Sequence, residues 1–269
     1  MSVRRRDRGM LVAMSTFVIV HGAWGGGWEW SPVADLLREN GHVVFTPTLT
    51  GMGERAHLDQ RGHVGLETHV EDVVAVMAFE DLRKVVLVGA SYGGMPVTGA
   101  GDRAGDRVSM VVYVDALVPL AGQSALDLLP HAFGDMVRTG VDEHGTQWRV
   151  PMPTALSAAL FPVGSLPDDI RARYLARVRD QPAATFMEPI HLEGTIDRLP
   201  RAFVRCTAAE FPAELGDPIE ACARRARAAG WPSRELPAPH DPQVFDPSGI
   251  ATILHELADV ASASARGVR

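Results

Sequence analysis

Cysteine is scarce in this sequence. Only Cys206 and Cys222 are present, and they do not have the spacing of a C-x-x-C motif. This excludes a disulfide framework and a cysteine-rich zinc cluster. H-E-x-x-H and comparable ligand spacings are also missing, so we expect no metal centre and no cofactor. Two isolated thiols fit a reducing, cytoplasmic compartment.

Positive charge is also in short supply. The chain has 26 Lys and Arg residues against 33 Asp and Glu residues, a formal net charge of -7. Binding to nucleic acid depends on clustered basic side chains that neutralise phosphates. We therefore expect neither a nucleic-acid partner nor a membrane partner, and the composition leaves a monomer and a homodimer open.

The N-terminus superficially resembles a secretory signal, because Arg4-Arg5-Arg6 precede the apolar stretch 10–20. That stretch runs directly into His21-Gly22-Ala23-Trp24, and no A-x-A-like cleavage site lies ahead of it. Cleavage there would remove a core strand. We expect residues 1–14 to be a flexible basic extension and the protein to be cytoplasmic.

What the sequence does contain is alternation. With 269 residues, 46% of them hydrophobic, the chain can bury the core of one domain. Short apolar runs predict strands, and helical stretches separate them, which indicates an α/β fold with a mostly parallel sheet. The predicted strands are Thr16–Val20, Val43–Thr46, Val85–Val88, Met110–Val114, Ala202–Arg205 and Arg234–Leu236; the predicted helices are Ser31–Asn40, Leu66–Phe79, Ser91–Ala100, Asp217–Ala229 and Pro247–Ser262.

The alternation breaks in the middle of the chain. Residues 117–199 are rich in Pro, Gly and short helical pieces, with no convincing strand. We interpret them as a helical cap over the carboxyl edge of the sheet, where open α/β sheets bind ligands. Residues 15–116 and 200–269 then form the core of a single domain.

Gly89-Ala90-Ser91-Tyr92-Gly93 follows the clearest strand and precedes a helix of small residues. In a G-x-S-x-G turn of this kind the glycines allow a turn too tight for Cβ atoms, and the serine is exposed at the top of the sheet. We expect Ser91 to be a catalytic nucleophile. The backbone N–H groups of Tyr92 and Ala23 are the expected oxyanion-hole donors, since one donor follows the nucleophile and the other lies in the loop after an early strand.

A serine nucleophile needs a base and an acid, which follow in the order Ser, acid, His in this type of fold. His240 is the predicted base, because it lies in a Pro-rich loop after the last strand; His255 lies inside the final helix. The acid is ambiguous. Glu210 is preferred because it follows the strand Ala202–Arg205, and Asp115 at the end of Met110–Val114 is the alternative.

With these residues in place, the chain resembles the α/β-hydrolase family of plant methylesterases and hydroxynitrile lyases and of bacterial esterases and pyrethroid hydrolases. The resemblance rests on FVIVHGAWGGGWEW (17–30), GHVVFTPTLTGMGERAHL (41–58), VVLVGASYGG (85–94), VYVDALVP (112–119) and His240-Asp241-Pro242. It implies the α/β-hydrolase fold, with the cap inserted after the sixth strand of the family's usual numbering. It also implies the roles given above to Ser91, His240, Ala23 and Tyr92.

Two departures from the lyases of that family matter. The lyases have a threonine where this chain has Gly22 and a lysine where it has Asp241. Cyanohydrin cleavage is therefore not expected. The family's usual acid falls at Ala209 or Glu210, depending on a shift of one residue. Asp241 is expected to point away from His240 and to form hydrogen bonds within its loop.

The sequence therefore predicts a serine hydrolase that cleaves a small hydrophobic carboxylic ester. Trp24, Leu126, Phe133 and Trp148 are its expected substrate-binding residues. Two other classes stay open: a biosynthetic cyclase, lyase or carbon–carbon bond hydrolase on the same fold, and a ligand-binding relative without catalysis.

Overall fold

The computed structural model describes residues 14–59, 62–143, 148–211, 217 and 219–264. Apart from Met14, the predicted N-terminal extension lies outside the described residues. None of the helices in these ranges is both long enough and apolar enough to cross a membrane.

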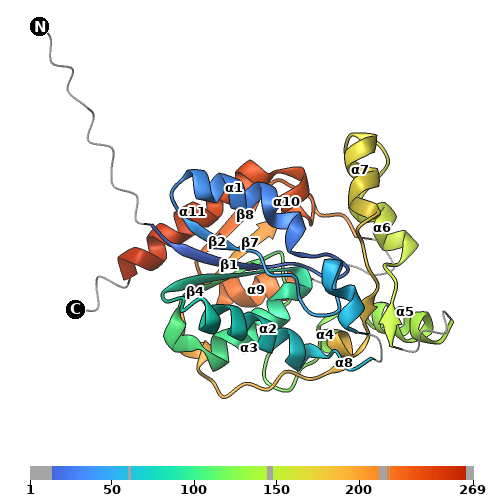
Figure 1. Cartoon of the computed structure of the whole chain (residues 1–269), viewed down its shortest axis with the longest axis horizontal. Coiled ribbons are helices and arrows are strands. Elements are labelled where there is room, and N and C mark those ends of the chain that lie inside the picture. The colour runs from blue at the N-terminus through green and yellow to red at the C-terminus, as the bar shows by residue number, and fades with distance from the viewer. Residues whose placement is uncertain (1–13, 60–61, 144–147, 212–216, 218, 265–269) are drawn as a thin grey trace, which may run out of the picture.

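The core is a sheet of six parallel strands, which Figure 1 shows between layers of helices. In the order β2-β1-β3-β4-β7-β8, all neighbouring strands pair in parallel, so that their carboxyl ends lie along one edge. This confirms the predicted fold class. The strands are β1 (Thr16–Val20), β2 (Val43–Phe45), β3 (Val85–Ala90), β4 (Val108–Val114), β7 (Arg201–Cys206) and β8 (Ser233–Leu236).

Both faces of this sheet are buried, and the side-chain period of two divides each strand between them. In β3, Val85 and Leu87 belong to one apolar cluster, whereas Val86 and Val88 belong to the other. A sheet covered on both sides explains why the central strands are continuous apolar runs rather than alternating ones.

Helices cover each face (Figure 1). On one face α1 (Ser31–Glu39) packs beside α11 (Pro247–Ser264). On the other lie α2 (Leu66–Phe79), α3 (Gly94–Arg103) and α9 (Glu220–Ala228). The core contains in addition α10 (Pro242–Phe245) and the short 3-10 helices η1 (Gly27–Trp30), η2 (Gly53–Leu58), η3 (Ser91–Gly93), η4 (Gly105–Arg107) and η5 (Ile196–Arg198).

The segment after β4 forms the cap, which lies at one end of the molecule in Figure 1. Its helices are α4 (Ala125–Leu128), α5 (His131–Glu143), α6 (Thr154–Leu160), α7 (Asp168–Leu175) and α8 (Ala184–Met187). The expectation of no strand here is wrong, because β5 (Arg149–Val150) and β6 (Gln181–Pro182) form a small antiparallel pair. Strands of two residues are too short to show a periodic pattern.

Trp24 attaches this cap to the core. Its indole Nε1–H donates to the carbonyl of Val150 at 2.9 Å, and its backbone N–H donates to Oε1 of Gln181 at 3.1 Å. The backbone N–H of Arg179 donates to the Trp24 carbonyl. The residue after the predicted oxyanion donor is thus fixed by both cap strands.

Candidate active site

Ser91 lies at the carboxyl end of β3, where the chain turns sharply into η3 and α3. Its φ of 51° falls in the left-handed region, which is strained for a residue with a side chain. Neighbouring backbone segments lie so near to the turn that its glycines have no room for a side chain. A Cβ on Gly89 would lie 2.6 Å from the Gly93 carbonyl oxygen, and a Cβ on Gly93 would lie 2.6 Å from the carbonyl oxygens of Val20 and His21.

Gly93→Ala is therefore expected to lower the free energy of unfolding by about 1–3 kcal/mol, because the added methyl group overlaps rigid backbone. Gly134→Ala is the matched control: a Cβ there would approach only the flexible end of Arg138, at 3.3 Å. Alanine should stabilise that helix by about 0.5–1 kcal/mol. Urea unfolding of both variants tests the prediction, and equal stabilities would contradict it.

Ser91, His240 and Asp115 form a continuous hydrogen-bonded series. Ser91 Oγ lies 2.8 Å from Nε2 of His240, and Nδ1 of His240 lies 2.6 Å from Oδ2 of Asp115. A carboxylate can only accept a hydrogen bond, so Nδ1 of His240 carries the proton. Nε2 therefore accepts a hydrogen bond from the serine hydroxyl. His255, the other late histidine, is bonded to His42 instead, with 2.8 Å between Nδ1 and Nε2.

Asp115 is held firmly at the end of β4. Its side chain is fully buried, and its φ is 43°. Oδ1 accepts the backbone N–H of Cys206 at 3.1 Å and a guanidinium N–H of Arg205, which also forms an ion pair with Asp217. These donors fix the carboxylate with Oδ2 directed at the imidazole. Arg205 carries no local sequence signal for this role, because the role appears only once β4 and β7 are neighbours.

The preference for Glu210 as the partner of His240 is wrong in geometric terms. Glu210 is exposed, and in the described part of the chain its carboxylate forms no hydrogen bond with His240. The physical reason is the strand order: β4 lies between β3 and β7, so its end is adjacent to Ser91. A carboxylate at this position reaches the imidazole directly, whereas the turn after β7 leads Glu210 out to solvent.

The surroundings of His240 determine its basicity. Burial by itself lowers the pKa of His240, but the hydrogen bond and charge of Asp115 outweigh it, and the charge of Asp241 adds to the effect. The pKa therefore lies above the ordinary value of 6.5. A more basic imidazole is better suited to removing a proton from serine.

The loop after β1 passes directly over Ser91. A Cβ on Gly22 would lie 3.2 Å from Ser91 Cβ, so only glycine fits there without displacing the serine. Nε2 of His21 accepts the Leu49 backbone N–H at 3.1 Å, so Nδ1 carries the proton and donates to the Gly22 carbonyl at 2.7 Å. Burial lowers the pKa of His21 to about 4, which keeps the ring neutral. This contact fixes the peptide plane between Gly22 and Ala23, and thereby the direction of the Ala23 N–H.

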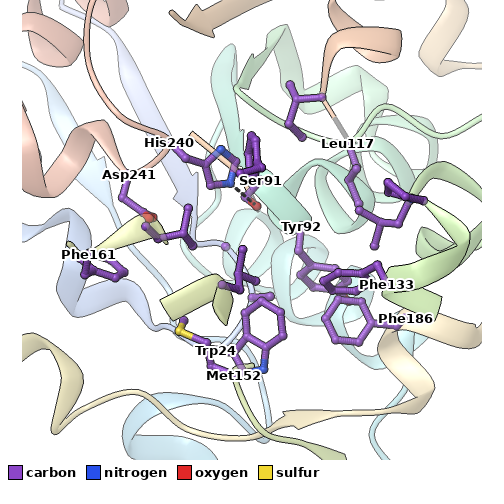
Figure 2. A pocket seen from close by; sticks show the side chains of 18 of the residues that line it. Trp24, Ser91, Tyr92, Leu117, Phe133, Met152, Phe161, Phe186, His240 and Asp241 are labelled. Atoms are coloured by element: carbon purple, nitrogen blue, oxygen red, sulfur yellow. Dashed lines mark hydrogen bonds between the residues drawn. The ribbon is translucent and has the colours of Figure 1, made fainter. Parts of the chain in front are cut away.

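A largely apolar pocket opens at Ser91 (Figure 2). Of the expected substrate-binding residues, Trp24 and Phe133 line it, and Leu126 and Trp148 do not. Leu126 packs into the core cluster, and Trp148 lies against Gly62. The direction of Leu126 depends on the rotation of α4, and Trp148 lies in the turn before β5; the sequence pattern determines neither direction. The other apolar side chains that line the pocket include Leu129, Met152, Leu156, Leu160, Phe161 and Phe186.

Asp241 differs from its expected role. It does form a hydrogen bond within its loop, since Nε2 of Gln243 donates to Oδ1 at 3.1 Å. Its side chain, however, also lines the pocket beside His240 (Figure 2). Among the described residues no hydrogen bond joins it to His240, so its place in the pocket wall is what the sequence did not predict.

Comparison with known proteins gives several curated relatives with esterase names, among them the following two. The carbendazim-hydrolysing esterase of a Nocardioides species is 41% identical over 191 residues, which covers 67% of this chain and 75% of that esterase. Methylesterase 8 of Arabidopsis thaliana is 36% identical over 107 residues, 38% of either protein. These relatives support the prediction of a hydrolase that acts on esters.

The fold has close counterparts among solved structures. An extracellular α/β-hydrolase from a Paenibacillus species matches with a TM-score of 0.78 at 24% identity, covering 90% of this chain and 98% of that one. The sequence model of the α/β-hydrolase family matches residues 17–261. The predicted resemblance is confirmed, and the chain belongs to the α/β-hydrolase family.

Proposed function

We propose that this protein is a serine hydrolase that cleaves a small hydrophobic carboxylic ester through an acyl-enzyme on Ser91. The observation that carries the proposal is the series Ser91–His240–Asp115, which ends at an apolar pocket. The esterase names of the relatives from Nocardioides and Arabidopsis support the choice of an ester.

In the acylation half, Ser91 Oγ attacks the ester carbonyl carbon while Nε2 of His240 removes the hydroxyl proton. The carbonyl oxygen becomes an oxyanion, and the backbone N–H groups of Ala23 and Tyr92 stabilise it. Asp115 holds the imidazole in the required tautomer and stabilises its positive charge. Collapse of the intermediate breaks the bond to the alcohol oxygen, which takes the proton from His240 and leaves.

In the deacylation half, a water molecule attacks the acyl carbon while His240 removes one of its protons. The second tetrahedral intermediate collapses, Ser91 recovers a proton from His240, and the carboxylic acid is released. No group beyond the chain and water is needed for this cycle.

A substrate screen tests the proposal. The wild type is expected to hydrolyse p-nitrophenyl butyrate, and a panel of methyl, aryl and short-chain esters should rank the accepted acyl and alcohol parts. A rapid burst of p-nitrophenol equal to the enzyme concentration would report the acyl-enzyme if deacylation is slower. Failure of the folded protein to cleave any ester of the panel would contradict the proposal.

The pH dependence of kcat/KM is expected to follow His240. Since the base must be neutral, activity falls as pH drops below its pKa, which Asp115 and Asp241 hold above 6.5 against the opposing effect of burial. We expect the midpoint of the acid limb above pH 6.5, because kcat/KM reports groups of the free enzyme. A midpoint below the ordinary histidine value would contradict the conclusion that Asp115 raises the pKa of His240.

A further inference from the structure

Asp241 is a charged side chain in an otherwise apolar pocket. Among the described residues that line the pocket, no other Asp, Glu, Lys or Arg occurs. In Figure 2 Asp241 lies next to His240 on the side of Phe161, while Tyr92, Phe133 and Phe186 form the opposite side. The pocket therefore has one side with a carboxyl group and one side rich in aromatic rings, with Ser91 between them.

One oxygen of this carboxyl group is available to a ligand. Oδ1 accepts from Gln243, whose side chain is buried and holds the carboxyl in place. Within the described ranges, Oδ2 has no protein donor, and no Lys or Arg forms an ion pair with Asp241. A half-buried carboxylate oxygen without a hydrogen-bond donor is costly, and a ligand that brings a donor to it recovers that cost.

A second carboxyl group, that of Glu29, is buried behind this side of the pocket. Oε1 of Glu29 accepts from the hydroxyl of Tyr174, a pocket-lining residue, at 2.8 Å. Burial raises the pKa of Glu29, and the charge of Asp241 raises it further. Burial likewise raises the pKa of Asp241. These shifts mean that negative charge is unfavourable here until a donor or a cation arrives.

We propose that Asp241 is a specificity-determining residue, and that the ester carries an N–H donor, neutral or cationic, which binds Oδ2 of Asp241 while an apolar part occupies the aromatic side. An amide or ammonium nitrogen suits this position better than a hydroxyl, because it brings no acceptor lone pair towards the carboxyl group of Asp241. Phe161 and Tyr174, with ring centroids 4.5 Å apart, require that the group bearing the N–H is otherwise apolar. The inference rests on the proposed function, since it names the substrates of that same site.

Two matched pairs of esters test it, one with the donor in the alcohol part and one with the donor in the acyl part. The first pair is meta-acetamidophenyl butyrate and its analogue with a methylene in place of the N–H. The second pair is the p-nitrophenyl ester of N-acetyl-β-alanine and its methylene analogue. For the wild type, kcat/KM of the N–H member is expected to exceed that of its analogue by about tenfold or more in at least one pair.

Variants identify the acceptor. In Asp241→Leu the ratio within the pair should fall to near unity, whereas Asp241→Asn should keep part of it, because an amide oxygen still accepts. Glu210→Gln, which changes an exposed carboxylate, should keep the wild-type ratio. Using the ratio removes any general loss of activity from the comparison, and thermal unfolding shows whether each variant is folded.

The outcomes separate the inference from the proposed function. If the wild type hydrolyses p-nitrophenyl butyrate but the ratio is within about twofold in both pairs, the inference is wrong and the serine hydrolase stands. A ratio that survives in Asp241→Leu overturns it as well. If Asp241→Leu does not fold, an unchanged ratio in Asp241→Asn overturns it. If no ester is cleaved at all, the proposed function itself fails.

Discussion

Ser91→Ala is expected to lower kcat/KM for p-nitrophenyl butyrate by roughly 10⁴–10⁶-fold, and His240→Ala by a similar factor. The two side chains act as one unit, since Oγ and Nε2 share a hydrogen bond of 2.8 Å. Removing either group therefore removes the activated nucleophile. For the same reason, the double variant should be about as inactive as either single variant.

Thermal unfolding provides the control, because neither change should unfold the protein. A loss of less than about tenfold in folded Ser91→Ala would contradict the nucleophile. Dependence on His240 together with tolerance of Ser91→Ala would instead favour a lyase, cyclase or carbon–carbon bond hydrolase. If the wild type binds a ligand but turns over no ester, and Ser91→Ala binds that ligand equally well, a binding protein would be favoured.

Asp115→Asn is expected to lower kcat/KM by about 10²–10⁴-fold, because an amide at this position no longer holds the tautomer and no longer stabilises the imidazolium. The acid limb of the pH profile should also move to lower pH, since Asp115 is the main group that raises the pKa of His240 against the effect of burial. Glu210→Gln is the matched change at the other candidate acid.

The exposed Glu210 should retain activity within about twofold of wild type. A larger loss in Glu210→Gln than in Asp115→Asn would reverse the assignment of the acid. Equal pH profiles for wild type and Asp115→Asn would contradict the effect given to the carboxylate.

The core was predictable because its signals are local. The apolar run of β3 and the glycines around Ser91 act within a few residues, and the structure has this strand and turn as expected. The base of this type of fold comes after the last strand, which points to His240, and the structure places the loop of His240 beside Ser91. The helix Leu66–Phe79 has the same bounds in the structure as in the prediction.

What could not be predicted depends on which strands become neighbours. Choosing between Asp115 and Glu210 requires knowing that β4 ends beside β3 and that Arg205 of β7 holds the carboxylate. The pocket lining has the same difficulty, because Leu126 and Phe133 are equally apolar in sequence and only their rotation in the cap separates them. The place of Asp241 in the pocket wall is likewise not predictable, because adjacency in the chain does not reveal the direction of a side chain.

The central claim is that Ser91 is the nucleophile of an acyl transfer, and covalent labelling tests it most directly. The folded wild type is treated with a fluorophosphonate, and the modified peptide is located by mass spectrometry. We expect a single stoichiometric adduct on Ser91 that is lost in Ser91→Ala and strongly slowed in His240→Ala. The absence of an adduct on Ser91 in folded protein, or labelling of another serine at the same rate, would contradict the claim.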